Sequence, residues 1–327
     1  MRRETHRGTG RKLTGEAAPE WNASFGAAQR PRDWFADIAT TEKDMNHQHV
    51  LSPVVVGIDG SDAAIAAALW AADEAIARDV PLRLIYAADV APIHPYGDFR
   101  VQITKAEPLF RAADAAVAAT GKTVKVETAV VGAGPRPGLI SQSRAAEMMC
   151  VGSVGVRRAG DVPGSTAAAL ANAAFCPVAI IGPDVTRRAA DGGWIAVSID
   201  NSPGSDLTIE NGFAEAKLRR APLLALGVGL AVNGCDQLDQ RLDPWRDRYP
   251  EVRVRAVPAP DGVAEFVSTS TEPVQLAVIG SGQVAPLMRF GPAAAISVVD
   301  LCSVLVVRRY TELRTQERTG KVAWDYS

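Results

Sequence analysis

The part of the chain with the clearest chemical potential is the glycine-rich stretch VGSVGVRRAGDVPGST, residues 151–166. The candidate glycines in it are Gly152, Gly155 and Gly164. Glycine adopts positive φ at little cost and lets backbone N–H groups approach an anion closely. Ser165 and Thr166 then open an expected helix, whose first N–H groups and positive end attract phosphate. The stretch is therefore either a phosphate-binding loop or an ordinary glycine-rich turn.

A carboxylate is the second candidate group. Asp59 ends the apolar run PVVVGID, residues 53–59, which is typical of a strand buried on both faces of a parallel sheet. Ligands of open α/β sheets bind beyond the carboxyl ends of the strands, where both Asp59 and the glycine-rich stretch are expected. Because a carboxylate repels phosphate, Asp59 would accept hydrogen bonds from the ribose or base of a nucleotide. The alternative is that Asp59 only caps the helix that follows.

The glycine-rich stretch differs from two better-known phosphate-binding motifs. No Gly-Lys-Ser/Thr follows it, so the lysine of a P-loop is missing, and it is not a G-x-G-x-x-G fingerprint. Arg157 and Arg158 lie within it and either neutralise phosphate charge or are simply solvated. The sequence leaves both interpretations open.

Strands and helices alternate from Pro53 onwards, which predicts an open, Rossmann-like parallel sheet of the α/β class. The expected strands are residues 53–59, 81–90, 125–132, 148–153 and 177–182. The expected helices are residues 61–79, 105–120, 138–147 and 165–174, the second of them interrupted early by Pro108. Residues 91–104 are expected to form an irregular loop.

The pattern then restarts. The motif Ile58-Asp59-Gly60-Ser61 returns as Ile199-Asp200-Asn201-Ser202, and QLAVIGSGQ resembles the earlier EMMCVGSVG. We therefore predict a disordered extension (1–50), a first repeat (51–184), a second repeat (192–310) and a C-terminal tail (311–327), with the repeats forming two tandem domains. The apolar segments PVAII and SVLVV are expected to pair within the chain and so cover both sheet edges; a homodimer is the alternative pairing.

The pattern G-x-x-G, a spacer and G-S before a helix, followed by Cys-Pro-Val and an apolar strand, resembles the ATP-binding motif of the universal stress protein family. The I-D-G-S motif and VVGAGPRPGLI match as well. The resemblance spans about residues 50–310 and implies the adenine nucleotide alpha-hydrolase-like fold. The spacer between the second and third glycines has eight residues, one fewer than is usual in the family.

The resemblance also implies an adenine-nucleotide site in the first repeat, with ATP as its ligand. Asp59 would lie near the adenosine, and the strand end at Ala87 and Ala88 would contact adenine through its backbone. The ribose and phosphates would be held by Gly152, Gly155, Gly164, Ser165 and Thr166. A bound nucleotide would change the surface that meets a partner protein or a second subunit.

The second repeat departs from this pattern. Asp200 and Gly280 persist, but Gln283 stands where the second glycine is expected, and Pro292 follows Gly291 in place of serine. Proline removes an N–H donor that a phosphate would use. We therefore predict a degenerate site in the second repeat.

The composition narrows the function classes further. The formal net charge of −2 offers no basic field for nucleic acid. No apolar stretch reaches the roughly 18–20 residues of a membrane helix, no secretory signal opens the chain, and the four cysteines lack metal spacing, so a cytoplasmic protein is expected. No Ser/His/Asp order or carboxylate cluster indicates catalysis. The expected function is regulation through bound ATP; the alternatives are a nucleotide-free stress-response scaffold and a slow ATP hydrolase.

Overall fold

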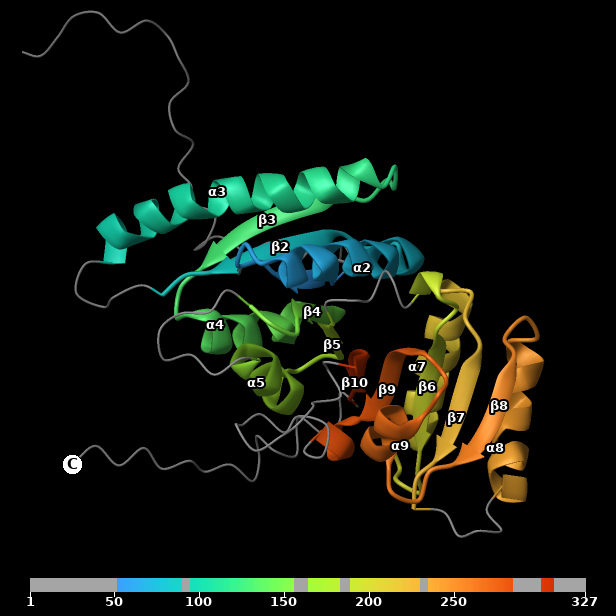
Figure 1. The fold of residues 1–327 in the computed structure, drawn as a ribbon. Helices are drawn as coiled ribbons and strands as arrows, with labels where there is room; N and C mark the ends of the chain where they lie inside the picture. The colour runs from blue at the N-terminus through green and yellow to red at the C-terminus, as the bar shows by residue number, and fades with distance from the viewer. Residues whose placement is uncertain are drawn as a thin grey trace, which may run out of the picture. The chain divides into compact units, whose positions relative to one another are not determined.

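The structure is a computed structural model that describes residues 52–89, 95–155, 164–182, 189–229, 235–284 and 301–308. The sequence predictions for the N-terminal extension, the C-terminal tail, the arginines at 157 and 158 and the Gly291-Pro292 pair lie outside these residues. Within them, helices cover both faces of a single ten-stranded sheet (Figure 1). The sheet is parallel except where its two halves meet. The predicted α/β class is therefore confirmed.

The first repeat contributes one half of the sheet in the strand order β3-β2-β1-β4-β5. The strands are β1 (Val54–Gly57), β2 (Leu82–Ala87), β3 (Val126–Val131), β4 (Met148–Gly152) and β5 (Val178–Ile181). The helices are α2 (Asp62–Arg78), α3 (Pro95–Ala119), α4 (Pro135–Gln142) and α5 (Ser165–Ala173). This is the order of the nucleotide-binding half of a Rossmann sheet, with a switch point between β1 and β4.

Buried side chains on successive strand positions point to opposite faces of the sheet and explain the two helix layers. Val54 and Val56 pack in one core cluster with residues of α2 and α3. Val55 packs in the other, with Leu139 of α4 and Leu170 of α5. A strand buried on both faces needs apolar residues at every position, which is why β1 lacks polar alternation.

Helix α3 begins earlier than predicted. Residues 95–104, expected as part of an irregular loop, form the start of α3, which continues through Pro108. Proline removes one N–H from the helix and crowds the preceding turn, so it favours a break. The break does not occur because Ala106 and Ala113 bury one face of the helix while Pro108 faces solvent. Burial of that face outweighs the local preference of a single residue.

The second repeat contributes the other half of the sheet in the mirrored order β10-β9-β6-β7-β8. Its strands are β6 (Trp194–Ile199), β7 (Leu223–Gly227), β8 (Val254–Pro258), β9 (Val274–Gly280) and β10 (Ser303–Val307). Its helices are α7 (Ser205–Leu218), α8 (Cys235–Arg248) and α9 (Val263–Thr269). Each strand thus has a counterpart in the first repeat, β6 to β1 and β9 to β4.

The two halves join through β5 and β10, which pair antiparallel with Ile180 opposite Val304 and Val178 opposite Val306. The Ser303 hydroxyl also accepts a hydrogen bond of 3.1 Å from the N–H of Gly182. The pairing of PVAII with SVLVV within one chain is therefore confirmed. It covers two sheet edges that would otherwise expose unpaired backbone groups.

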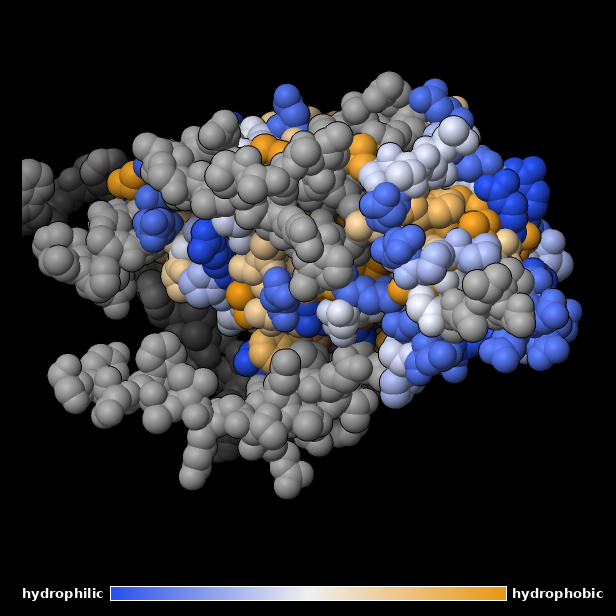
Figure 2. Space-filling model, turned by 60° about the horizontal axis from the view of Figure 1, so that its bottom comes forward, coloured by the Kyte–Doolittle hydropathy of each residue, from blue (hydrophilic) through white to orange (hydrophobic). Residues whose placement is uncertain are grey.

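The surface of the described residues carries both hydrophilic and hydrophobic side chains (Figure 2). Their large, exposed hydrophobic side chains are Ile76, Val101 and Val154, and hydrophilic residues surround small hydrophobic areas on the face in Figure 2. None of the helices among these residues has both the length and the apolarity required to cross a bilayer.

Candidate functional site

A cavity of about 200 Å³ opens at the carboxyl ends of β1 and β4, where the connections leave the sheet in opposite directions. The predicted site residues that line it are Asp59, Gly152, Gly155, Gly164, Ser165 and Thr166. The fold therefore brings together six residues that come from two segments about 90 positions apart. Ala88, the seventh, is not among the lining residues.

Asp59 and Ser61 form one polar unit at the end of β1. Asp59 Oδ1 accepts hydrogen bonds from the Ser61 N–H at 3.0 Å and from the Ser61 hydroxyl at 2.7 Å. The N-cap of α2 is Ser61, whose Oγ accepts from Ala64 N–H at 3.1 Å. The alternative in which Asp59 caps the helix is therefore wrong: Ser61 caps it, and Asp59 fixes the orientation of Ser61 while lining the cavity.

The loop after β4 passes close to the Asp59 carboxylate and requires glycine at position 155. A Cβ placed on Gly155 would overlap Asp59 Oδ2, so only a residue without a side chain lets the loop pass this close to the carboxylate. Gly152 meets a different neighbour, because a Cβ there would lie 2.7 Å from the backbone carbon of Ala63 in the first turn of α2. Gly155 thus lets the loop approach Asp59, whereas Gly152 lets α2 approach β4.

Gly152→Ala should therefore destabilise the fold. The added methyl group would push the first turn of α2 away from β4, which we expect to lower the free energy of unfolding by about 1–3 kcal/mol. Urea denaturation measures the change. The matched control is Gly132→Ala, because a Cβ on Gly132 has no neighbour within 4 Å; it should leave stability unchanged or raise it by up to about 1 kcal/mol. Equal stabilities for the two variants would contradict the inference that Gly152 lets α2 approach β4.

The N-terminus of α5 supplies backbone donors to the cavity. Gly164 has φ of 72°, a left-handed conformation that glycine adopts readily, and turns the chain into Ser165 at the start of the helix. The first hydrogen bond of α5 runs from the N–H of Ala168 to the carbonyl of Gly164. The N–H groups of residues 165–167 therefore have no acceptor within the helix, and residues 164–167 all line the cavity. Such a helix start is suited to an anion.

The wall at the end of β2 differs by one residue from the sequence prediction. Ala87 and Tyr86 line the cavity. Ala88 is fully buried; its N–H donates to the carbonyl of Val131 at 2.7 Å, and its carbonyl accepts from Gly134 N–H at 2.9 Å. Its backbone groups thus hold β2 to the turn before α4, which accounts for its absence from the cavity wall.

Sequence reasoning missed several lining residues. Ser153 lines the cavity but is only 2% exposed, and its buried hydroxyl has no hydrogen-bond partner among the described residues. Leu109 from α3 and Leu139 from α4 supply apolar walls. The position of Ser153 between the first two glycines of the motif could have identified it. Nothing in the sequence indicates that Leu109 reaches this site.

None of the cysteines described by the structure lines the cavity. Cys150, Cys176 and Cys302 are buried, and burial raises the pKa of the Cys150 and Cys176 thiols, that of Cys176 to about 12. The thiols of Cys150 and Cys176 therefore remain protonated at neutral pH and behave as small apolar groups. Nowhere in the described parts of the chain do three or more acidic, histidine or cysteine side chains gather in a way that could hold a metal ion.

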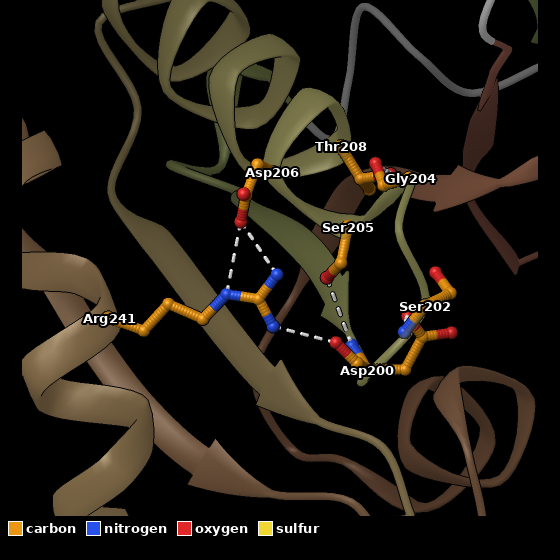
Figure 3. Close-up of polar contacts among 7 residues, drawn as sticks. All are labelled: Asp200, Ser202, Gly204, Ser205, Asp206, Thr208 and Arg241. Carbon is orange, nitrogen blue, oxygen red and sulfur yellow. Dashed lines mark hydrogen bonds and ion pairs between the residues drawn. The ribbon is translucent and has the colours of Figure 1, made fainter.

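The second repeat uses the corresponding strand end differently, as Figure 3 shows. Arg241 from α8 donates from Nη1 to the carbonyl of Asp200 at 2.7 Å and from Nη2 to Asp206 at 2.6 Å. The Ser205 hydroxyl accepts from Asp200 N–H at 3.2 Å, while Asp200 Oδ1 accepts from Ser202 N–H at 3.0 Å. The turn after β6 therefore repeats the turn after β1, but an arginine from a neighbouring helix fixes it.

Gln283 completes this difference. Its Nε2 donates to Asp200 Oδ2 at 2.9 Å, and Gln283 corresponds in the alignment of the repeats to Gly155. In the first repeat a residue without a side chain lies against the aspartate; in the second a side-chain amide donates a hydrogen bond to it. The sequence predicted only that the second repeat lacks this glycine. The structure shows that the residue in its place, Gln283, forms a hydrogen bond to Asp200.

Comparison with known proteins agrees with this architecture. The model of the universal stress protein family matches residues 51–182. Universal stress protein Rv2624c of Mycobacterium tuberculosis H37Rv is 44% identical over 266 residues, which cover 79% of this chain and 97% of that protein. Universal stress protein Rv2028c of the same strain is 36% identical over 276 residues, 80% of this chain and 98% of the relative.

Among solved structures, a universal stress protein from Archaeoglobus fulgidus DSM 4304 superimposes with a TM-score of 0.58 at 16% identity. The match covers 79% of this chain and 98% of that one and shows a shared fold. At this length the mycobacterial matches extend beyond one repeat and into the second. The repeated motifs, the mirrored sheet and these relatives together show that the chain belongs to the universal stress protein family.

Proposed function

We propose that this protein binds one adenine nucleotide, ATP, in the cavity of the first repeat and acts as a regulatory protein through that binding. The cavity offers two chemically distinct ends. Asp59 and Ser61 present oxygen acceptors and a hydroxyl on one side, and the start of α5 presents backbone donors on the other. This polarity fits a ligand with hydroxyl groups at one end and phosphate at the other.

The observation that carries this proposal is the hydroxyl of Ser153. A buried polar group without a partner costs about 1–3 kcal/mol, so buried hydroxyls normally have hydrogen bonds. Ser153 lies between Gly152 and Gly155, on the wall of the cavity, and its hydroxyl has no partner among the described residues. Rotation of the Ser153 side chain toward the cavity would let a bound nucleotide supply the missing bond.

The apolar part of the cavity fits a base. Ile85, Ala87 and Leu139 line it beside the polar groups. A planar heteroaromatic ring buries its faces against such side chains and directs its edge at backbone groups. We therefore infer that the base lies toward the end of β2 and that the phosphates lie toward the start of α5.

We assign the role of the first repeat to binding rather than to catalysis. The only carboxylate among the described lining residues, Asp59, is held by two hydrogen bonds from Ser61. A bound nucleotide would favour one conformation of the cavity rim and so alter the surface that a partner or second subunit meets. Cys150, Cys176 and Cys302 are buried and not in disulfide bonds, which suits a reducing compartment and supports a cytoplasmic location.

The test is thermal unfolding of the full chain with and without ATP. At a hundredfold excess of ATP over Kd we expect stabilisation by about 2.7 kcal/mol. Asp59→Ala should abolish most of this gain, whereas its counterpart Asp200→Ala should retain it, because Gln283 already engages Asp200. Titration calorimetry should give one site per chain. Absence of any shift in the wild type would favour the nucleotide-free scaffold, and release of ADP over hours would favour the hydrolase.

A further inference from the structure

Four charged residues meet where α2 of the first repeat faces the end of α7 of the second. We call Glu74, Arg78, Glu215 and Arg219 the Glu–Arg cluster. Arg78 Nη2 lies 3.0 Å from Glu74 Oε2, and Arg219 Nε lies 2.9 Å from Glu215 Oε2. Arg219 Nη2 also donates to Glu74 Oε1, so this guanidinium bridges two carboxyl groups from different repeats.

The Glu–Arg cluster follows the internal repeat. Glu74 and Glu215 are 141 positions apart, as are Arg78 and Arg219, and the same offset relates Asp59 to Asp200. Both helices thus carry a Glu-x-x-x-Arg pair at equivalent positions. Because the two halves of the sheet have mirrored strand orders, these pairs meet at the junction. The contact itself is asymmetric: Arg219 reaches Glu74 across the junction, whereas Arg78 pairs with Glu74 of its own helix.

Three of the four side chains of the Glu–Arg cluster are deeply buried, and the fourth, Arg78, is 28% exposed. The side chains of Glu74, Glu215 and Arg219 are 1%, 3% and 10% exposed, and Arg219 also lies over the ring of Trp70 at 4.1 Å. Burial and, to a smaller extent, the neighbouring Glu215 raise the pKa of Glu74, and Arg219 and Arg78 lower it; the net result is a pKa of about 8. Arg219 holds both carboxyl groups against one guanidinium, and two carboxyl groups that share a buried site are readily joined by one proton.

We propose that the Glu–Arg cluster is a proton-linked contact between the two repeats: at neutral pH one proton lies between the carboxyl groups of Glu74 and Glu215, and its loss weakens the packing of α2 against α7. The titratable and charged groups that face Glu74 are Glu215 and Arg219 from the second repeat, Arg78 from α2 itself, and the buried thiol of Cys150 from β4. This inference concerns the junction of the repeats and does not depend on the proposed nucleotide.

The sign of the effect follows from the difference between the folded and unfolded states. Glu74 keeps its proton in the folded protein at a pH at which the unfolded chain has lost it. Its contribution to stability is therefore complete below about pH 4.5 and is lost as the pH rises through about 8. For this one proton, the unfolding equilibrium constant rises about tenfold per pH unit between those limits.

The experiment is urea denaturation of the full chain, without nucleotide, at pH values from 5 to 9. Glu74→Gln replaces the shared proton by an amide that can still donate to Glu215. We expect the ratio of wild-type to variant unfolding constants to rise about tenfold between pH 6 and pH 7. The matched control is Glu210→Gln. Glu210 of α7 forms an exposed ion pair with Arg248 of α8, so the pH profile of this variant should run parallel to that of the wild type.

Parallel profiles for the wild type and Glu74→Gln would overturn the proposal. Infrared spectroscopy of the folded wild type gives an independent readout that does not require the variant to fold. A carboxylic-acid C=O band should persist at pH 7, where ordinary carboxyl groups are ionised, and should disappear above about pH 8. Its absence at pH 7 would equally exclude a proton between Glu74 and Glu215.

Discussion

Replacing Arg219 by alanine is expected to lower the free energy of unfolding by about 3–5 kcal/mol. The guanidinium of Arg219 bridges Glu74 and Glu215, which are almost fully buried. Its removal leaves two carboxyl groups facing each other in an apolar setting, and it also removes the cation over the Trp70 ring. Urea denaturation at pH 7 measures the loss. A cost of this size is a large fraction of the stability of an ordinary domain.

A control variant separates the effect of removing a buried arginine from the effect of removing a positive charge at the surface. Arg111→Ala removes an arginine that pairs with Glu107 at 3.3 Å on the exposed side of α3, where the two side chains are 78% and 56% exposed. Exposed pairs of this kind contribute about 0–1 kcal/mol, so this variant should unfold nearly like the wild type. If Arg219→Ala were equally mild, the Glu–Arg cluster would not be a principal contact between the repeats.

Gly155→Val is expected to abolish the stabilisation by ATP while leaving the fold intact. Gly155 is exposed, and its φ lies outside the left-handed region, so valine is compatible with the backbone. Its Cβ would nevertheless occupy the space in front of Asp59 Oδ2, where the proposed ligand must approach. The gain of about 2.7 kcal/mol at a hundredfold excess of ATP should fall close to zero, as thermal unfolding with and without ATP would show.

The matched control lies in the second repeat. Gly282 corresponds to Val154, and a Cβ on Gly282 has no neighbour within 4 Å. Gly282→Val therefore places the same side chain on the equivalent loop without approaching an aspartate and should keep the full response to ATP. Undiminished stabilisation of Gly155→Val by ATP would show that the nucleotide binds elsewhere or that Asp59 takes no part.

Much of the fold could be predicted from the sequence because its signals are local. The continuous apolar run ending at Asp59 predicts a strand buried on both faces, and the following Ser61 marks the start of α2. The prediction for α3 was wrong because it relied on a local signal that the tertiary structure overrides. Pro108 is a local signal against helix, and burial of the face that contains Ala113 outweighs it. That burial depends on a neighbouring helix, which local spacing does not reveal.

The site divides in the same way. The sequence alone determines the strand-end aspartate, the glycines without side chains and the hydroxyls that open α5, because a motif fixes residue type and spacing within one segment. The tertiary structure alone decides that Ser153 is left without a partner, that Ala88 turns away from the cavity and that Gln283 holds Asp200. Each of these outcomes depends on an atom from a different segment.

The Glu–Arg cluster is the clearest case. Its four residues are evident in the sequence as two unremarkable Glu-x-x-x-Arg pairs on amphipathic helices, where solvated ion pairs are the usual outcome. The repeat itself was determined by the sequence. Only the antiparallel join of β5 to β10 brings Glu74 and Arg219, 145 positions apart, into contact. Burial then converts weak surface pairs into a strongly coupled group, because the attraction and the desolvation of charges both grow when water is excluded.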